Sequence, residues 1–183
     1  NIVEGAFPGC RILAAKDGKI FYDEAFGYYT YSKATPVTLE TMYGVASLTK
    51  VLATNLAVMK LYDQGKLDLN KRLGNYLPSV KGTNKEFLTI KNLLLHQAGL
   101  KAWIPFYNET LDSLGGLRQD LYQDKSSKEF SIPVAKNLYL RTDWKDSMWN
   151  RILKSPMDNY GKYVYSDLDF YFLAAVVEQL TQK

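Results

Sequence analysis

Hydrophobic and polar positions give the beginning of the chain the pattern of a β-hairpin. Residues 10–16 and 19–27 are two apolar-rich runs, and Asp17-Gly18 separates them. An Asp-Gly pair between such runs is typical of a two-residue hairpin turn, because a type I′ turn requires positive φ at both central residues. The sequence therefore predicts two antiparallel strands joined at Asp17-Gly18.

The pattern changes to a helical period at Ser47. Apolar residues then recur at three- and four-residue spacings, which predicts an amphipathic helix over residues 47–64. Gly65 stands where a glycine commonly follows the end of a helix. The residues assigned to the apolar face are Val51, Leu52, Leu56, Met59 and Tyr62.

Two shorter helices are predicted in the middle of the chain. Residues 68–77 are a helical candidate that Pro78 ends. Thr89 can cap a second helix, which extends through residue 95. Residues 101–135 are punctuated by glycine and proline and predict irregular structure with one short helix.

The last part of the chain predicts a short β-like stretch at residues 163–165, followed by a helix. Ser166 can cap this helix, whose apolar part covers residues 168–180. Ser166 and Asp169 also have the spacing of a capping box, in which each side chain binds the backbone of the other.

Composition and charge exclude several classes of protein. The 183 residues include one Cys and one His, so neither an internal disulfide nor a four-ligand zinc site of these residues is possible. The net charge of +4 is not gathered into a basic stripe, and no nucleic-acid partner is expected. No apolar stretch is long enough to span a bilayer, and no signal peptide is recognisable at the start. The 14 Tyr, 8 Phe and 3 Trp favour an aromatic-rich core over an aromatic groove for a peptide or sugar.

Ser47 and Lys50 are the residues best placed for chemistry. They stand one turn apart at the start of the predicted helix 47–64, so their side chains share a face. The positive end of the helix dipole and burial would both lower the pKa of Lys50, which would make its amine a base beside a hydroxyl nucleophile. The alternative is a plain N-cap serine followed by a solvated lysine.

His96 is the sole histidine and ends the apolar run of residues 93–95. A Ser-His-Asp triad would have to use it as the base. A structural histidine, bonded to backbone near the end of its helix, is the favoured interpretation. Neither a metal nor a cofactor is indicated, because no acidic cluster with ligand spacing and no glycine-rich phosphate loop is present.

Three ordered motifs resemble the serine β-lactamase and penicillin-binding-protein superfamily, in particular its class C-like branch. The first is residues 42–50 with Ser47-Leu48-Thr49-Lys50, together with residues 61–69. The second is residues 88–100, which resemble a Thr-Ile-x-x-Leu-Leu-x-His-x-x-Gly-Leu stretch. The third is Tyr165-Ser166-Asp167, where the branch has Tyr-x-Asn. Residues 6–10 and 103–107 also resemble the β-lactamase-like domains that are fused to family 3 glycoside hydrolases.

The resemblance implies a mixed α/β (α+β) fold of the β-lactamase/transpeptidase type. Residues 1–30 would supply the N-terminal hairpin of an incomplete antiparallel sheet, and residues 40–183 a mainly helical region. A further motif of the family, Lys or His followed by Thr or Ser and Gly, does not occur in residues 1–183. The chain is therefore expected to be the N-terminal half of a domain, inactive alone, with an open sheet edge that is mobile or pairs with a second copy.

The resemblance also implies roles for individual residues. Ser47 would be the acylated nucleophile, Lys50 its base and Tyr165 a proton relay, acting on a small-molecule or peptide substrate. Asp167 would contact the substrate in place of the usual asparagine, although a carboxylate accepts hydrogen bonds and cannot donate them. A carboxylate near Lys50 would also favour the charged ammonium and oppose its role as a base.

Two functions are expected from this interpretation. The first is a serine hydrolase that acts on an amide or ester, such as a β-lactam or a D-Ala peptide, outside the cytoplasm. The alternative is a catalytically silent accessory or binding module attached to a glycoside hydrolase, for which Asp167 would be a sign of lost chemistry.

Overall fold

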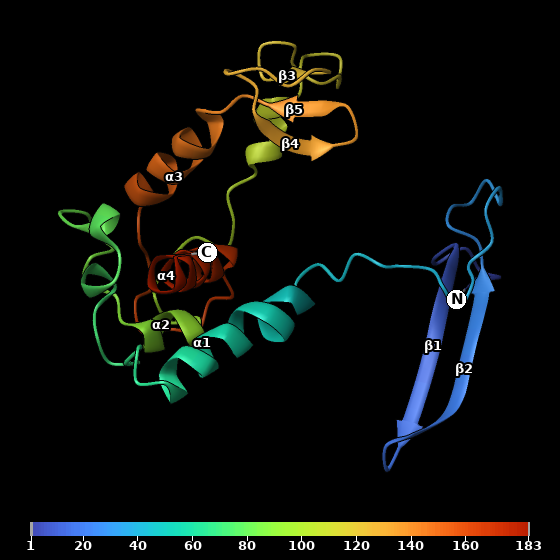
Figure 1. Cartoon of the computed structure of the whole chain (residues 1–183), viewed down its shortest axis with the longest axis horizontal. Helices are drawn as coiled ribbons and strands as arrows, with labels where there is room; N and C mark the ends of the chain where they lie inside the picture. Colours follow the sequence, from blue (N-terminus) through green and yellow to red (C-terminus); the bar gives the residue numbers. More distant parts are fainter. Residues whose placement is uncertain (1, 183) are drawn as a thin grey trace. The chain divides into compact units, whose positions relative to one another are not determined.

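The computed structural model describes residues 2–182, and the chain divides into two compact units, Asn1–Ala46 and Ser47–Lys183. The first unit consists of a two-stranded antiparallel sheet and its connections. The second combines helices with a small three-stranded sheet (Figure 1). The expected mixed α/β class is confirmed.

The predicted hairpin is present in the first unit. Strand β1 (Gly9–Lys16) pairs antiparallel with β2 (Lys19–Gly27). Asp17 and Gly18 have φ values of 50° and 74°, as the predicted turn requires. The Arg11 guanidinium binds both carboxylate oxygens of Asp23 across the strands, at 2.8 and 2.7 Å.

The hairpin has almost no core of its own. Val37 is the single buried hydrophobic residue among the described residues of this unit. Large apolar side chains of the two strands are exposed instead, including Leu13, Ile20 and Phe21. The pairing of β1 with β2 therefore rests mainly on backbone hydrogen bonds and the Arg11 ion pair.

The second unit begins with the helix predicted from Ser47. A π-helical segment, η1 (Lys50–Thr54), continues directly into α1 (Asn55–Asp63), and a turn from Lys50 N–H to the Ser47 carbonyl at 3.0 Å precedes it. The predicted helix is present, but the apolar residues that indicated it are not the buried ones. Val58 and Leu61 are buried on α1, whereas the predicted apolar face of Val51, Leu52, Leu56, Met59 and Tyr62 is exposed.

The helix predicted at residues 68–77 is wrong. The chain instead forms two single 3₁₀ turns, η2 (Leu73–Asn75) and η3 (Pro78–Val80). The N–H groups of Leu73 and Gly74 donate to the carbonyls of residues 88 and 86, so they are not available for helical hydrogen bonds.

Two helices with the predicted caps form the centre of the second unit. The hydroxyl of Thr89 accepts a hydrogen bond from the Asn92 N–H at the start of α2 (Ile90–Leu94). The hydroxyl of Ser166 accepts from the Leu168 N–H at the start of α4 (Asp167–Thr181). The proposed capping box of Ser166 with Asp169 does not form, because the Asp169 carboxylate binds His96 instead.

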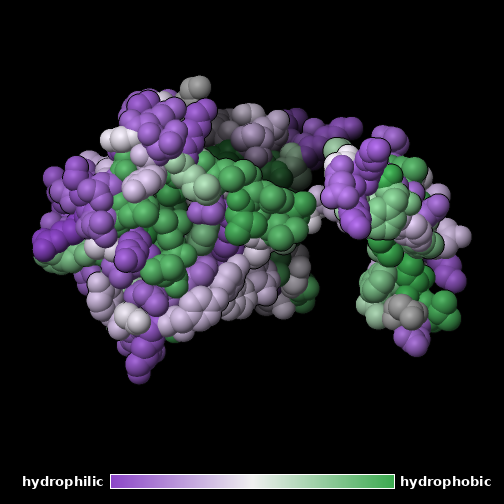
Figure 2. Space-filling model, turned by 90° about the horizontal axis from the view of Figure 1, so that it is seen from below, coloured by the Kyte–Doolittle hydropathy of each residue, from purple (hydrophilic) through white to green (hydrophobic). Residues whose placement is uncertain are grey.

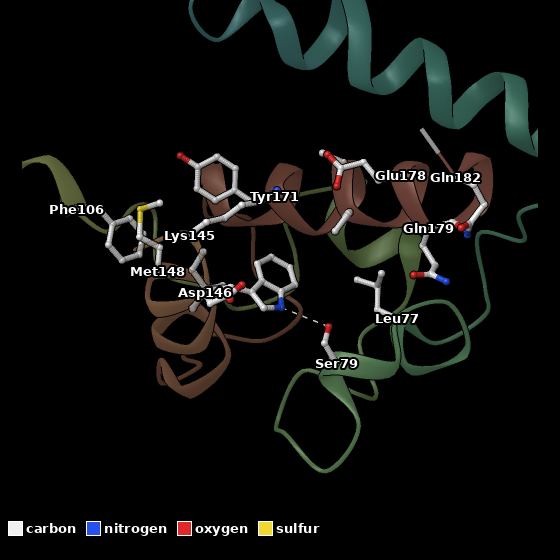
Figure 3. A pocket seen from close by; sticks show the side chains of 14 residues that line it. Leu77, Ser79, Phe106, Lys145, Asp146, Met148, Tyr171, Glu178, Gln179 and Gln182 are labelled. Atoms are coloured by element: carbon white, nitrogen blue, oxygen red, sulfur yellow. Dashed lines mark hydrogen bonds between the residues drawn. The ribbon is translucent and has the colours of Figure 1, made fainter. Parts of the chain in front are cut away.

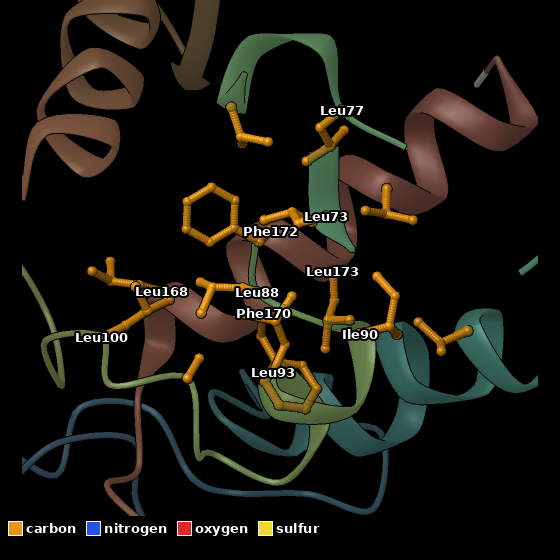
Figure 4. Packing of buried hydrophobic residues seen from close by; sticks show 14 of the residues in the cluster. Leu73, Leu77, Leu88, Ile90, Leu93, Leu100, Leu168, Phe170, Phe172 and Leu173 are labelled. Carbon is orange, nitrogen blue, oxygen red and sulfur yellow. The ribbon is translucent and has the colours of Figure 1, made fainter. Parts of the chain in front are cut away.

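The main hydrophobic core lies where α4 packs on α2 and the 3₁₀ turns (Figure 4). Phe172 and Leu173 of α4 are fully buried in it, and Leu73, Leu88 and Leu93 contribute from the other elements. Burial of each such side chain contributes about 1.5–3 kcal/mol. These contacts fix α4, and α4 begins at the residues of the candidate site.

The sequence did not indicate four elements of the second unit. Strands β3 (Tyr122–Gln123), β5 (Leu138–Leu140) and β4 (Ile132–Ala135) form an antiparallel sheet in that order. Helix α3 (Trp144–Lys154) follows, and Leu121, Leu140 and Trp144 form a second small core. The predicted short helix in the irregular region is the 3₁₀ segment η4 (Phe106–Thr110).

Residues 96–102 and residues 158–167 are two irregular segments that hydrogen-bond to each other, and Tyr165 lies in the second. The Asp158 N–H donates to the Gly99 carbonyl at 2.8 Å, and the Asp167 N–H donates to the Ala102 carbonyl at 2.8 Å. Gly99 is required here, because its φ is +72° and a Cβ would lie 2.6 Å from the Asp158 carbonyl oxygen. The strand predicted at residues 163–165 is wrong: these residues bind His96 rather than a strand.

The aromatic side chains contribute less to the cores than expected. Phe130, Trp144, Phe170 and Phe172 are buried, while most tyrosines in the described part of the chain are exposed. Among residues 2–182, no helix is sufficiently long and apolar to cross a membrane.

Candidate active site

Ser47 and Lys50 lie together at the start of the helical segment, as their spacing predicts. Lys50 Nζ is 3.1 Å from Ser47 Oγ, so the ammonium donates a hydrogen bond to the serine hydroxyl. The π-helical turn η1 begins at Lys50 itself, and such turns occur frequently at functional sites. The Ser47 side chain is exposed, so the hydroxyl is open to a substrate.

Asp167 joins this pair from the first residue of α4. Its Oδ1 lies 2.6 Å from Lys50 Nζ. The Lys50 side chain is 15% exposed and that of Asp167 is 35% exposed, so water screens the ion pair only in part. The structure thus shows the contact that would oppose a neutral Lys50.

Tyr165 completes a group of four side chains. Lys50 Nζ is 5.2 Å from the centre of its ring. Hydrogen bonding from Ser47 and from Lys50, together with the positive charge of Lys50, lowers the pKa of the Tyr165 phenol. The phenol is therefore easier to deprotonate than an ordinary tyrosine.

The pKa of Lys50 is raised rather than lowered. Burial alone would lower it, as the sequence argument assumed, but hydrogen bonds to Asp167 and Tyr165 and their negative charges outweigh burial. The expectation of a lowered Lys50 pKa is therefore wrong in this structure, and the reason is Asp167. The site holds an ammonium ion beside a hydroxyl and an acidified phenol.

A second polar pair, His96 and Asp169, lies next to Tyr165. His96 Nδ1 is 2.7 Å from Asp169 Oδ2, and the two ring centres of His96 and Tyr165 are 4.7 Å apart. The sequence indicated a structural histidine that binds backbone, and the Ser166 N–H does approach Nδ1 at 3.2 Å. Asp169 was assigned to a helix cap, so its contact with His96 was not foreseen. One signal was available, because a carboxylate three residues into a strongly apolar helix needs a partner.

A well-defined hollow of the second unit is separate from these residues. It measures about 730 Å³ and lies between η3, α3 and α4 (Figure 3). Trp149, whose indole N–H donates to the Ser79 hydroxyl at 3.3 Å, forms part of its wall with Tyr171. Ser47, Lys50, Tyr165 and Asp167 do not line it.

Nothing in the described residues forms a metal centre, since no three of their His, Cys, Asp and Glu side chains cluster at ligand distance. The four side chains can do chemistry with protons and covalent bonds alone. Ser47 offers a nucleophilic oxygen, Tyr165 a proton acceptor when ionised, and Lys50 a fixed positive charge.

Two curated relatives match nearly the whole chain. The N-acetylmuramyl-L-alanine amidase of Bacillus subtilis (strain 168) is 30% identical over 196 residues, which cover 99% of this chain and 39% of the amidase. A Salmonella typhimurium (strain LT2) protein provisionally named D-alanyl-D-alanine carboxypeptidase is 30% identical over 198 residues. The match covers 99% of this chain and 40% of the carboxypeptidase. The chain thus spans about two fifths of the length of these relatives.

The fold is also that of a solved structure. The crystal structure of FmtA from Staphylococcus aureus has a TM-score of 0.66 and 27% sequence identity, and the match covers 100% of this chain and 42% of FmtA. The Beta-lactamase family model matches residues 2–183. The three motifs, the mixed α/β fold and this match agree, and the chain belongs to the β-lactamase family, within the superfamily of serine β-lactamases and penicillin-binding proteins.

Proposed function

We propose that this chain carries the nucleophile and its activating residues for a serine hydrolase that acts on an amide or ester. The observation that carries the proposal is the hydrogen bond of 3.1 Å between Lys50 Nζ and Ser47 Oγ, with Tyr165 beside both residues. Nucleophile and activating group within hydrogen-bond reach are the signature of covalent catalysis. Membership of a family of hydrolases supports the same conclusion.

In the proposed reaction, Ser47 Oγ attacks the substrate carbonyl carbon and transfers its proton to the ionised Tyr165 phenol. The carbonyl double bond opens to an oxyanion. When the double bond re-forms, the bond to the leaving amine or alkoxide breaks, and Tyr165 returns the proton to that group. Water then hydrolyses the acyl-Ser47 ester by the same proton route in reverse.

In the proposed scheme Lys50 is not the base. Asp167 raises the pKa of Lys50, so a neutral amine is disfavoured at neutral pH. The ammonium instead lowers the pKa of Tyr165 and stabilises the phenolate that accepts the proton. We therefore assign proton acceptance to Tyr165 and electrostatic support to Lys50.

The proposed substrates are β-lactams, D-Ala peptides or their ester analogues. The two curated relatives are named as an N-acetylmuramyl-L-alanine amidase and a D-alanyl-D-alanine carboxypeptidase, and both names fit cleavage of an amide bond. Such substrates place the proposed activity outside the cytoplasm.

The alternative is a silent accessory module, and Asp167 is the observation that favours it. A carboxylate cannot donate a hydrogen bond to a substrate carbonyl, as an asparagine would. The two functions differ in one measurable property, which is covalent modification of Ser47.

The deciding experiment is active-site labelling with a fluorophosphonate and with a fluorescent penicillin. We propose that residues 1–183 are the N-terminal half of a domain and that turnover needs the Lys/His-Thr/Ser-Gly motif, which these residues lack. The assay therefore compares the 183-residue chain with a polypeptide that also carries this motif, called the longer polypeptide below. Label should appear on Ser47 of the longer polypeptide, and Ser47→Ala should abolish it while the melting temperature stays nearly unchanged. Thr49→Ser is the matched control, since it changes a neighbouring hydroxyl residue and should leave labelling intact.

Two results would contradict the proposal. Absence of label, or label on another serine, would favour the silent module. Turnover of an ester or cephalosporin reporter by the 183-residue chain, abolished by Ser47→Ala, would show that the Lys/His-Thr/Ser-Gly motif is not needed.

A further inference from the structure

We propose that His96 and Asp169 form a positioning pair that holds Tyr165 beside Ser47 and Lys50. The proposal rests on the proposed function, because it gives the pair a role in the reaction of Ser47. Neither residue touches the Ser47 hydroxyl, so the pair acts through Tyr165.

The first argument is that His96 binds the chain on both sides of Tyr165. The backbone carbonyl of His96 accepts the N–H of Val164 at 2.8 Å. Its Nδ1 lies 3.2 Å from the N–H of Ser166. The two amides that flank Tyr165 are thus bound by one residue, which fixes the direction in which the Tyr165 side chain leaves the backbone.

The backbone of His96 makes this double contact possible. His96 follows α2 with a φ of 53°, in the left-handed region that non-glycine residues seldom adopt. This conformation is unfavourable for a residue that carries a Cβ. It persists because the carbonyl and the imidazole of His96 both bind the segment around Tyr165.

The second argument is ring packing. The imidazole is 4.7 Å from the ring centre of Tyr165, and it also contacts Tyr163 edge-on at 5.9 Å and Phe170 at 5.5 Å. The His96 side chain is only 11% exposed. A rotation of the imidazole would therefore displace the Tyr165 ring as well.

The third argument is that Asp169 has no other task among the described residues. Its side chain is 1% exposed, Oδ2 binds His96 Nδ1 at 2.7 Å, and the buried Oδ1 has no hydrogen-bond partner. A buried carboxyl group costs stability unless its interactions compensate. The single interaction that it makes orients the imidazole beneath Tyr165.

The environment favours an uncharged pair. Burial raises the pKa of Asp169 to about 8, while burial and the positive charge of Lys50 lower the pKa of His96. A neutral Asp169 donates its O–H to the unprotonated Nδ1 at 2.7 Å, and the single lone pair of Nδ1 is shared with the longer contact from the Ser166 N–H at 3.2 Å. The charged groups that face His96 are Lys50 and Asp167, and the neighbouring phenols are Tyr163 and Tyr165.

Two substitutions of Asp169 separate positioning from simple structural support. Asp169→Asn keeps a hydrogen-bond donor for Nδ1 and has no charge. Asp169→Leu has the same number of side-chain heavy atoms but no polar atom. It also removes the unpartnered oxygen, so the melting temperature need not fall.

The main measurement is the titration of the Tyr165 phenol in the 183-residue chain, by NMR of tyrosine labelled with ¹³C at Cζ. Tyr165→Phe identifies the signal. In the native chain the phenol should titrate below the ordinary tyrosine range, because Ser47 and Lys50 lower its pKa. Asp169→Leu should return the titration toward that range, Asp169→Asn should not, and Tyr163→Phe is the control for loss of a neighbouring phenol.

The second measurement is the rate of Ser47 labelling in the longer polypeptide. Asp169→Leu should slow the acylation step by about tenfold or more with little change in the concentration for half-saturation, since a small displacement of a reacting group is costly. Asp169→Asn should remain within about threefold of the native rate. Unchanged Tyr165 titration and unchanged labelling in folded Asp169→Leu would overturn the proposal.

The outcomes distinguish this proposal from the proposed function. If Ser47 is never labelled, the hydrolase fails, and the Tyr165 titration alone decides the positioning pair. If Asp169→Leu does not fold, the native imidazole decides, because His96 is the sole histidine of the chain and its ¹⁵N signals need no assignment. The pair is supported if His96 Nδ1 accepts a hydrogen bond and if Tyr165→Phe shifts the ¹⁵N signals of His96. The pair is overturned if the imidazole titrates freely and Tyr165→Phe leaves its ¹⁵N signals unchanged.

Discussion

At the scale of single residues, Asp167 changes the chemistry of the site most. Its Oδ1 binds Lys50 Nζ at 2.6 Å. The contact raises the pKa of Lys50, and the negative charge of Asp167 opposes the lowering of the Tyr165 pKa. One carboxylate therefore restrains both groups that could accept the Ser47 proton.

Asp167→Asn should shift the pH profile of acylation toward lower pH. Without the carboxylate, the pKa values of Lys50 and Tyr165 both fall, so the proton-accepting forms are populated at lower pH. The measurement is the labelling rate of Ser47 against pH in the longer polypeptide. Glu178→Gln, which removes a distant carboxylate of α4, is the control and should leave the profile unchanged; an unaltered profile in Asp167→Asn would mean that Asp167 does not control either group.

The same ion pair also affects stability. The pKa of Lys50 is higher in the folded chain than its ordinary value of 10.5, so the pair stabilises the fold at pH values below 10.5. This contribution is lost as the pH rises through the folded pKa. Both groups are partly exposed, so its size is small.

Lys85 is a buried cation that makes no described contact with the candidate site, and burial lowers its pKa. Its side chain is 0% exposed, and Nζ donates to the carbonyl of Ser155, which ends α3, and to Asn84 Oδ1. The carboxyl-terminal end of a helix favours a positive charge, but burial dominates and lowers the pKa to about 8.

Because the folded pKa of Lys85 is lowered, the native chain should become more stable as the pH rises from about 8 to 10.5. Below pH 8 the folded chain carries the full cost of a buried charge, and above 10.5 the unfolded chain has lost its proton too. The gain is at most about 3 kcal/mol. Chemical denaturation of native chain and Lys85→Met at pH 7.5, 9 and 10.5 measures it: the difference between them should change in favour of the native chain, whereas a constant difference would contradict the buried charge.

At the scale of elements, periodicity identified helices but did not identify the buried side of α1. The sequence pattern puts Leu56 and Met59 on an apolar face, yet they are exposed, and Val58 and Leu61 contact the core. The spacing of apolar residues reveals that a helix has an apolar stripe, but it does not reveal which side of the helix packs against α4. Figure 2 shows hydrophobic residues over much of one face of the second unit.

Other elements were missed for different physical reasons. Helix α3 has a polar sequence, WKDSMWNRILK, and its helical state depends on packing of Trp144 and Ile152. Strands β3, β4 and β5 have two to four residues, too few for an alternating pattern. By contrast, caps such as Thr89 and Ser166 and the turn at Asp17-Gly18 depend on local chemistry, and they were predicted correctly.

The candidate site follows the same division. The Ser47–Lys50 contact was predictable, because both residues belong to one helical turn. The hydrogen bond between His96 and Asp169 joins residues 73 positions apart. It forms because backbone hydrogen bonds hold residues 96–102 against residues 158–167. No local pattern encodes that pairing.

The exposed stripe of η1 and α1 should make the isolated 183-residue chain bind hydrophobic dyes and associate with itself. A contiguous apolar surface of this kind is rare on a soluble monomer. Leu56→Glu with Met59→Glu should lower the fluorescence of bound anilinonaphthalene sulfonate severalfold and reduce association in sedimentation velocity. Lys60→Glu changes the charge of the same helix outside the stripe and should alter neither; equal dye binding by all three proteins would show that another surface is responsible.

At the scale of the whole molecule, stability is divided unequally between the two units. The second unit contains both hydrophobic cores, whereas the first has Val37 as its single buried hydrophobic residue among those described. A two-stranded hairpin is marginally stable in water even with favourable side-chain pairs. The two units should therefore open with very different free energies.

Hydrogen exchange measured by mass spectrometry should show this difference directly. In the 183-residue chain at micromolar concentration, amides of β1 and β2 should exchange at least about a hundredfold faster than those in the centre of α4, because local opening of the hairpin uncovers almost no apolar surface. Arg11→Ala removes the bidentate bond to Asp23 and should speed exchange in the hairpin further, while α4 stays unchanged. Measurements at higher protein concentration distinguish two states of the open sheet edge. If protection of β1 and β2 grows with concentration, the edge pairs with a second copy. If their protection stays low, the hairpin is mobile. Slow exchange in the hairpin, equal to that of α4 and independent of concentration, would show that the first unit has a source of stability beyond the contacts described.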